Sequence, residues 1–276
     1  MRDEDEFIIG PPNKLMLNLR ELWDFRELFY FFSWRDIKVK YKQATLGILW
    51  VVLQPVLMML IFTLFFGQIP GIQPEGIPYS VFTFSGLVFW NFFASCVTNA
   101  GNAMVSNASV IKKIYFPRLI IPVSAVLSAS VDLLITWLLF IIYLFIKQVP
   151  LSSSLFFYWP LAFLLTLSAT IGLGCWLSAL MVKYRDFRFI VPFAIQIGFF
   201  VTPVVYPVSR ITLPYVKYLV ALNPMYGAIN LFRQPIMPQT LLDMPLMIIS
   251  IVSSVSLLIV GILYFKKTEL FFADLA

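Results

Sequence analysis

Residues that could carry catalytic chemistry are scarce in this chain. It contains no histidine, which removes the usual general base, the Ser-His and Cys-His nucleophile pairs and the commonest metal ligand. No glycine begins the Gly-x-x-x-x-Gly-Lys-Ser/Thr pattern that cradles nucleotide phosphates. Cys96 and Cys175 lie in apolar segments and predict small buried side chains rather than a disulfide or metal framework. The sequence predicts no enzyme and no cofactor.

Asp132 is the one carboxylate deep inside a long apolar segment. An ionised carboxylate in a membrane costs at least about 2.5 kcal/mol, so such a residue is a functional candidate. We find no Lys or Arg at comparable depth. Two interpretations stay open: a functional group, or a structural aspartate that is protonated or bonded to hydroxyls or amides of a neighbouring helix. A membrane-embedded enzyme would need a second carboxylate, and an ion-coupled carrier would show more buried ionisable groups.

Aromatic residues form 17% of the chain, more than interfacial belts at helix ends require. Their flat apolar faces suit the C–H faces of sugar rings. Packing in the core or against lipid is the alternative for each one. The candidates to line a pathway are Phe62, Phe65, Phe66, Phe199, Phe200 and Tyr206.

The elements that must position these residues are helices in a membrane. Hydrophobic residues form 60% of the chain and charged residues only 12%, against about 25% in a soluble domain. Apolar runs of about 20 residues cross a hydrocarbon core of about 30 Å. The sequence predicts an all-α polytopic membrane protein with six spans, at 44–66, 79–103, 119–146, 156–182, 189–206 and 245–265.

The distribution of positive charge sets the expected orientation. The net charge of +6 comes from short clusters beside apolar runs, which argues against a nucleic-acid partner. With the predicted spans, sixteen of the 20 Lys and Arg residues fall on one side, which the positive-inside bias assigns to the cytoplasm. We expect a membrane protein with both termini cytoplasmic, an N-terminal segment at 1–43, a transmembrane domain at 44–265 and a tail at 266–276. The acidic residues 2–6 predict no cleaved signal peptide.

Two regions outside the spans are also expected to be helical. Apolar residues recur at spacings of three and four within 14–32, which predicts a helix lying on the membrane surface, although a helix packed on protein would show the same pattern; they are Leu15, Leu19, Leu22, Phe25, Phe29 and Phe32. Ser33 and Asp36 predict a capping box that starts a new helix at Trp34. Segments 211–222 and 225–236 are apolar but too short to span. They predict two short helices, either re-entrant beside a pathway or resting on the membrane as an external loop.

Several motifs then identify a family. They are residues 35–43, then Leu46, Gly47, Trp50, Gln54 and Pro55, then Phe84, Ser85, Gly86, Leu87, Trp90, Asn91 and Phe92, then Ser106, Asn107, Ile111, Lys112, Lys113, Tyr115, Phe116, Pro117 and Arg118, and finally Asn223, Pro224 and Met225. In order and spacing the chain resembles ABC-2 type polysaccharide exporter permeases, most closely the O-antigen type.

The resemblance implies a transport subunit of the bacterial cytoplasmic (inner) membrane that works with partners. It implies a homodimer of six-span permeases docked on two copies of a separate ABC ATP-binding subunit, which hydrolyses the ATP. The cargo would be an undecaprenyl-linked polysaccharide such as O-antigen, capsule or teichoic acid, handled among membrane lipids. The rival interpretation is an ABC-2 exporter of drugs or small lipids, which would need less aromatic lining.

The resemblance also implies site residues. A coupling helix at 106–117 would insert into the ATPase, with Ser106, Asn107, Ile111, Lys112, Lys113, Tyr115, Phe116, Pro117 and Arg118 as contacts. Short gate helices would occupy 211–236. A lipid pyrophosphate or cytoplasmic gate is our hypothesis for Trp34, Arg35, Lys38, Lys40 and Lys42. Positive residues on cytoplasmic loops also satisfy the orientation rule without any partner.

Overall fold

The computed structural model describes residues 19–42, 47–69, 73–74, 76–238 and 242–269. Every regular element within these ranges is a helix, which confirms the predicted all-α class. The helices are α1 (Leu19–Asp24), α2 (Arg26–Lys42), α3 (Gly47–Phe66), α4 (Tyr79–Ser106), α5 (Ala108–Ile111), α6 (Ile120–Ile146), α7 (Leu155–Lys183), α8 (Phe187–Val201), the single 3-10 turn η1 (Val208–Arg210), α9 (Pro214–Ala221), α10 (Pro224–Arg233) and α11 (Met244–Glu269).

Five of the described helices, α3, α4, α6, α7 and α11, are long and apolar enough to cross a membrane. The predicted fifth span, 189–206, is shorter in the structure, because α8 ends at Val201 and Thr202 is extended. Pro203 follows, and a residue before proline disfavours the helical region. The 15 residues of α8 cover about 22 Å, less than a hydrocarbon core. The count of six spans therefore stays a prediction.

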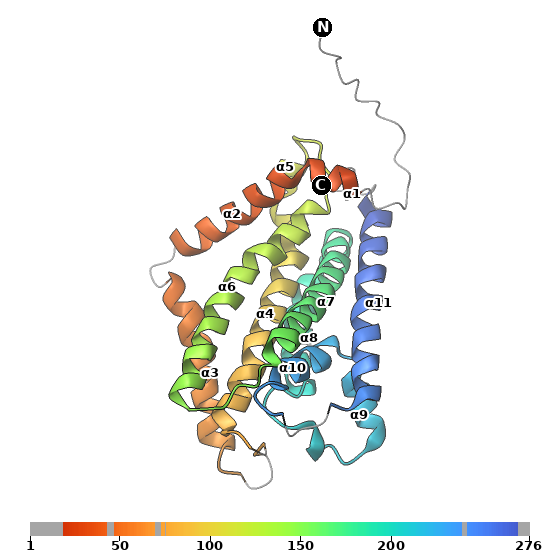
Figure 1. The fold of residues 1–276 in the computed structure, drawn as a ribbon. Helices are drawn as coiled ribbons and strands as arrows, with labels where there is room; N and C mark the ends of the chain where they lie inside the picture. Colours follow the sequence, from red (N-terminus) through yellow and green to blue (C-terminus); the bar gives the residue numbers. More distant parts are fainter. Residues whose placement is uncertain (1–18, 43–46, 70–72, 75, 239–241, 270–276) are drawn as a thin grey trace.

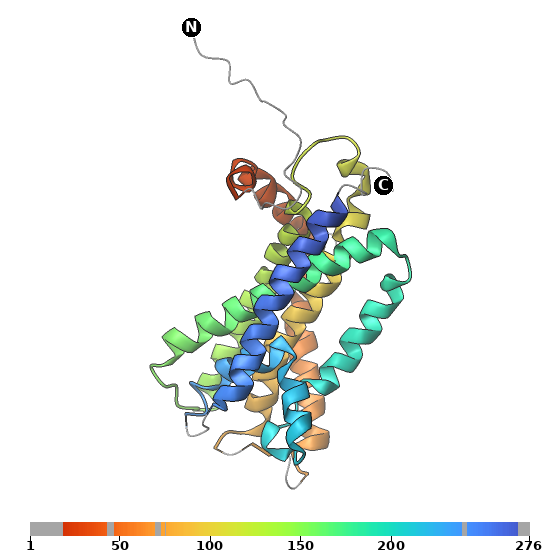
Figure 2. The ribbon, with the colours of Figure 1, turned by 90° about the vertical axis from the view of Figure 1, so that its right-hand side faces the viewer.

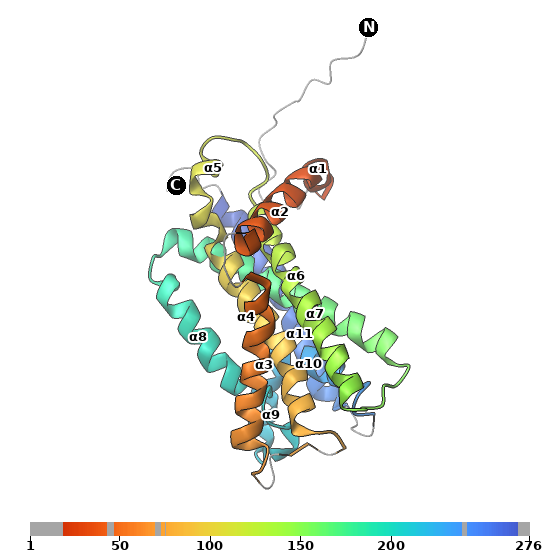
Figure 3. The ribbon, with the colours of Figure 1, turned by 90° about the vertical axis from the view of Figure 1, so that its left-hand side faces the viewer.

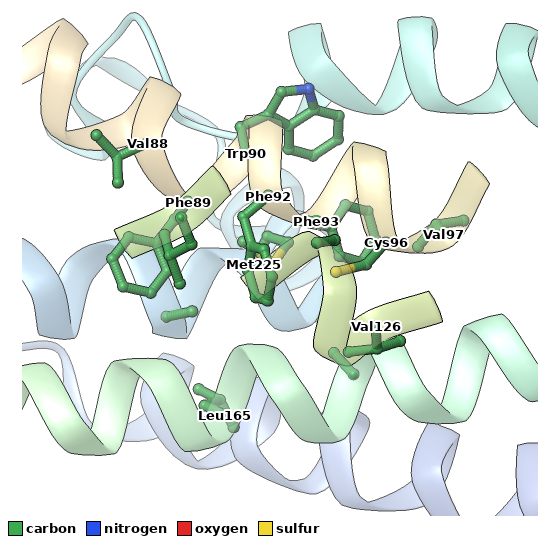
Figure 4. Packing of buried hydrophobic residues seen from close by; sticks show 14 of the residues in the cluster. Val88, Phe89, Trp90, Phe92, Phe93, Cys96, Val97, Val126, Leu165 and Met225 are labelled. Atoms are coloured by element: carbon green, nitrogen blue, oxygen red, sulfur yellow. The ribbon is translucent and has the colours of Figure 1, made fainter. Parts of the chain in front are cut away.

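The long helices form a bundle with α4 at its centre (Figure 1). Helices α2 and α5 lie at one end, which we call the α5 end, and α9 lies at the opposite end, the α9 end (Figures 1 and 2). Figure 4 shows side chains of α4 packed with Met225 of α10 and Leu165 of α7. Cys96 and Cys175 are free and buried, as the sequence predicted. Helix α8 leans out of the bundle (Figures 2 and 3).

Helices α7 and α11 cross where both carry glycine. A Cβ atom at Gly261 would lie 1.9 Å from the carbonyl oxygen of Gly172, and one at Gly172 would lie 2.4 Å from that of Leu257. Only glycine allows backbones to approach this closely in a membrane bundle. One turn away, the hydroxyls of Ser168 and Ser254 bond to each other. Because lipid offers no hydrophobic drive between helices, such contacts hold α11 to the bundle.

The N-terminal helices differ from the sequence prediction. Residues 14–18 lie outside the described residues, and the break falls at Phe25. The capping box at Ser33 and Asp36 is wrong, because α2 is continuous from Arg26 to Lys42. The Ser33 hydroxyl instead donates to the backbone oxygen of Ser124 on α6, at 3.2 Å. This bond joins two helices and needs no helix start.

The apolar face predicted for α1 and α2 packs on protein. Phe32 is buried, and its ring lies 5.7 Å from that of Phe116. Leu22, Phe25 and Phe29 also pack against the core. A second aromatic set is exposed: Trp23, Tyr30, Phe31 and Trp34. The helix therefore has a protein-facing side, which matches the alternative left open by the sequence, and an uncovered aromatic side.

Candidate functional site

A polar cavity lies between helices α3, α4 and α6, near the end of α2. Its volume is about 560 Å³. It is lined by Lys40, Gly47, Trp50, Val51, Gln54, Pro55, Asn91, Phe92, Ala94, Ser95, Thr98, Asn99, Asp132, Leu133 and Thr136. Polar side chains from four helices thus converge inside a bundle whose composition is that of a membrane protein.

Asp132 is bonded to a hydroxyl of a neighbouring helix, as one of the two open interpretations expected, and to a cation, which the sequence analysis did not expect. Lys40 forms an ion pair with its Oδ2 atom, and the Tyr41 hydroxyl donates to its Oδ1 atom. The prediction that no cation lies at comparable depth is therefore wrong. The end of α2 reaches α6 across 92 residues of sequence, which spacing along the chain does not reveal. Burial and the Asp132 carboxylate raise the pKa of Tyr41, so this phenol remains a donor at neutral pH.

A polar stripe runs along the α5-end half of α4. Asn91, Ser95, Asn99, Asn102 and Ser106 recur at spacings of three and four, so they share one face of the helix. None of the five is fully buried, although α4 as a whole is the most buried of the long helices. The sequence prediction missed this stripe, which a search for helical spacing of amides and hydroxyls within the second span would have found.

The predicted basic cluster on α2 divides into paired and unpaired residues. The Arg35 guanidinium bonds to Asp36 at 2.7 Å and lies over the Phe32 ring, and Lys40 is held by Asp132. Lys38 and Lys42 are exposed and form no ion pair within the described residues. Trp34 is exposed and stacks on Tyr30. Two of the four predicted cations therefore have no acidic partner in the part of the chain that the structure describes.

The predicted coupling segment 106–117 is mostly a loop. Its only helix among the described residues is the single turn α5. Asn107, Ile111 and Phe116 are buried and anchor the loop to the bundle. Between these anchors the chain exposes four consecutive residues, which we call the loop tip: Lys112, Lys113, Ile114 and Tyr115. The Tyr115 side chain is 82% exposed, the arrangement expected of a contact surface.

Arg118 differs from the other predicted coupling residues. Its backbone N–H donates to Glu269 Oε1 at 3.1 Å, and its guanidinium donates to the Glu269 backbone oxygen at 2.7 Å. Arg118 thus joins the start of α6 to the last turn of α11. The cationic side chain also satisfies a carbonyl that the helix end leaves without a partner. Pro117, beside it, is half-buried.

The predicted pathway aromatics meet at the ends of α3 and α8. The rings of Phe62 and Phe199 lie 5.6 Å apart, and Phe199 also contacts Trp90 of α4 at 5.9 Å. Phe66 packs on Phe62, and Phe200 packs on Phe199 while remaining exposed. Phe65 is exposed, whereas the Tyr206 hydroxyl donates to the Val201 carbonyl at 2.8 Å. The structure brings four of the six together and adds Trp90.

The segment predicted as two short helices forms the pair α9 and α10. Asn223 caps α10, because its side chain accepts from the Met225 N–H at 3.0 Å, and its amide also donates to the Thr202 hydroxyl. Nine of the ten residues of α10 are buried. Half of the residues of α9 are exposed, including Tyr215 and Leu219. The two helices therefore differ: α10 belongs to the core, whereas α9 reaches the core with Val220 and Ala221 and exposes its other side.

Arg233, which the sequence prediction missed, fixes α10 in place. It is 4% exposed and donates to the Ser85 hydroxyl and to the backbone oxygens of Phe82, Pro203 and Val204, at 2.7–3.1 Å. Its guanidinium carbon lies 3.6 Å from the Phe82 ring centroid. A lone arginine within the apolar segment 225–236 was the available signal, by the same reasoning that selected Asp132.

Comparison with known proteins gives the family. The model of the ABC-2 type transporter family matches residues 27–237. The chain is 31% identical to an O-antigen export system permease protein RfbA of Klebsiella pneumoniae over 95% of its length and 98% of the relative. It is 30% identical to RfbA of Myxococcus xanthus, over 92% and 97%. The polysialic acid transport protein KpsM of Escherichia coli is 24% identical over 74% of this chain and 79% of KpsM. The resemblance found in the motifs is confirmed, and the chain belongs to the ABC-2 type transporter family.

Proposed function

We propose that this chain is the permease subunit of an ABC exporter that moves a lipid-linked polysaccharide, of the O-antigen type, across the cytoplasmic membrane. The observation that carries the proposal is the 31% identity to an O-antigen export permease over nearly the full length of both chains. ATP hydrolysis takes place on two copies of a separate ATP-binding subunit. The permease supplies the membrane path and converts the partner's movement into opening.

The α5 end faces the cytoplasm and receives the ATPase. The charge bias of the sequence supports this orientation, because the loop tip, the basic part of α2 and Lys266 and Lys267 of α11 all lie toward this end. The loop tip presents two cations beside Ile114 and Tyr115. Aromatic residues anchor protein interfaces well, because they bury a large area at low entropic cost. Both chain termini then lie in the cytoplasm.

The uncovered aromatic side of α1 and α2 meets the membrane surface, and the basic part of α2 meets the pyrophosphate of the cargo. The exposed aromatic residues Trp23, Tyr30, Phe31 and Trp34 suit the head-group level of a bilayer. Lys38 and Lys42 are exposed without an acidic partner in the described part of the chain. These two residues, rather than Arg35 and Lys40, bind the lipid-linked anion.

Two permeases enclose the path as a homodimer. The apolar faces of α3 and α8 are largely exposed in a single chain, which supports their covering by a second copy. The polar stripe of α4 lines the cytoplasmic half of the path, where lipid would be a poor solvent for five amides and hydroxyls. The cluster around Phe62, Phe199 and Trp90 lines the outer half, and α9 gates it. ATP-driven rigid-body motion opens and closes the path.

Reconstitution tests the proposal. We expect proteoliposomes that hold the permease and its ATP-binding subunit to translocate undecaprenyl-diphosphate-linked polysaccharide only when ATP is hydrolysed. ATP-driven efflux of a dye or a short lipid without polysaccharide transport would favour the drug or small-lipid exporter. Transport without the ATP-binding subunit would contradict both. In the same assay Lys38→Gln with Lys42→Gln lowers transport while membrane insertion stays normal.

A further inference from the structure

The polar cavity between α3, α4 and α6 has the size of a small-ligand site. Its volume of about 560 Å³ lies within the range of roughly 300–1,000 Å³ that is common for such sites. The chain offers its own comparison. A second cavity of about 550 Å³ lies on the other side of α6, against α7, and its lining is apolar throughout, including Phe89, Leu134, Trp137 and Phe163. The two volumes are similar, but only the first cavity adds polar side chains to its apolar lining, which favours different occupants.

The lining of the polar cavity includes groups that are ready to bind. The side-chain amides of Gln54 and Asn91 have no hydrogen-bond partner within the described residues. The Asn99 side-chain amide donates one hydrogen bond, to the Ser95 hydroxyl at 3.2 Å. An amide facing lipid without a partner is costly, so these groups face water or a polar ligand.

Charge decides between a neutral and an anionic ligand. The cavity contains one cation, Lys40, and one carboxylate, Asp132, among its described lining residues, and the two are already paired. A phosphate would therefore find no cation in the cavity lining that is not already neutralised by a carboxylate. A sugar needs none, because each amide offers both a donor and an acceptor to hydroxyl groups. Trp50, on the cavity wall, adds a flat apolar face of the kind that packs on the C–H side of a sugar ring.

We propose that this cavity is a saccharide subsite that binds one neutral sugar unit of the cargo through the amides of Gln54 and Asn91, with Trp50 beside them. The inference rests on the proposed function and deepens it. Lys38 and Lys42, which form no ion pair with any residue that the structure describes, lie on α2, whose end borders the cavity. A lipid-linked chain can thus place its pyrophosphate on α2 and its first sugars in the cavity.

Binding measurements on the full permease–ATPase complex in nanodiscs test the subsite. The probes are farnesyl diphosphate and the same lipid carrying N-acetylglucosamine or galactose. We expect at least one sugar to tighten binding to the wild type by about tenfold, the effect of one or two hydrogen bonds. Gln54→Leu combined with Asn91→Leu should abolish this gain and leave the affinity for bare farnesyl diphosphate unchanged.

Two controls separate the outcomes. Leu134→Ala, in the apolar cavity, should keep the full sugar-dependent gain, and Gln54→Leu alone, at an exposed position of α3, should remove part of it if the double variant fails to fold. Equal affinity of the wild type for all three probes, or an unchanged gain in both leucine variants, would overturn the subsite while leaving the proposed function intact. Failure of every probe to bind would instead remove the lipid-pyrophosphate step of the proposed function and the subsite with it.

Discussion

The pairing of Asp132 with Lys40 and Tyr41 ties α2 to the bundle at the scale of single residues. The carboxylate is 15% exposed and the ammonium 46%, so the two groups do not depend equally on the pair. Removing the lysine leaves a mostly buried charge with one neutral donor. Removing the carboxylate leaves an ammonium that water can reach. Loss of Lys40 is therefore the more costly change.

Lys40→Gln should lower the melting temperature of the purified permease by roughly 3–6 °C. An ion pair with one half-exposed partner contributes about 1–2 kcal/mol to the free energy of unfolding. The measurement is a melting curve followed by tryptophan fluorescence in detergent. Lys38→Gln is the matched control, since that side chain is exposed and forms no ion pair within the described residues. Equal melting temperatures for the two variants would show that the ion pair does not stabilise the fold.

Arg233→Lys should destabilise the protein by about 2–4 kcal/mol despite keeping the charge, because a lysine cannot reproduce a fork that bonds to four acceptors. Gly86→Ala should act on the same contact, since the added Cβ would lie 2.7 Å from the guanidinium and 2.7 Å from the Val204 carbonyl. The measurement for both variants is protection of the α9–α10 segment from protease, which we expect to fall. Wild-type protection in both variants would mean that other contacts hold α10.

At the scale of elements, the loop between α4 and α6 has buried residues that hold it to the bundle and exposed residues that we propose as the docking contact. Tyr115→Ala removes an exposed ring of the loop tip, so it should weaken co-purification of the ATP-binding subunit at least about fivefold without changing the melting temperature. Phe116→Ala, one residue later, removes a buried ring and should lower the melting temperature instead. The reverse pattern would place the docking contact elsewhere.

The α7–α11 crossing makes a second prediction for an element. Gly261→Leu forces a side chain into a space where a Cβ atom alone would lie 1.9 Å from the Gly172 oxygen. The helices must separate, at a cost of about 3 kcal/mol or more. Val260→Leu, on the exposed side of α11, is the control. The measurement is hydrogen exchange of the α11 amides. We expect Gly261→Leu to lose protection of these amides and Val260→Leu to keep it.

Hydropathy located most long helices to within a few residues, since each apolar run has a length set by the bilayer. α4, α6, α7 and α11 begin or end close to the predicted limits. The errors came from contacts between distant segments. Ser33 was predicted to cap a helix because the sequence does not show its bond to Ser124, which lies 91 residues away. Lys40 was predicted to be a surface cation because its partner Asp132 lies 92 residues away. The polar stripe and Arg233, in contrast, carry a signal in the sequence itself: helical spacing of polar residues in the one case and a lone cation in an apolar segment in the other.

At the scale of the whole molecule, a single chain leaves the apolar faces of α3 and α8 largely uncovered. Only 11% of the apolar stretch of α3 is buried, against 78% of the corresponding stretch of α4. Helix α8 leaves Phe189, Phe193 and Phe200 uncovered. Lipid could cover apolar surface of this kind. It would not suit the polar stripe of α4. A second copy facing α3 and α8 would enclose the stripe in a shared water-filled path, which is the arrangement that the proposed homodimer requires.

Disulfide cross-linking tests that arrangement with the chain's own cysteines left in place, because Cys96 and Cys175 are buried. Leu64→Cys, on the exposed face of α3, or Phe193→Cys, on α8, should give a covalent dimer in native membranes under mild oxidation, since equivalent positions approach each other across a two-fold axis. Ile248→Cys, equally exposed but on α11, should remain monomeric. A dimer through α11 alone would move the path to the opposite side of the bundle and leave the α4 stripe without a role in transport.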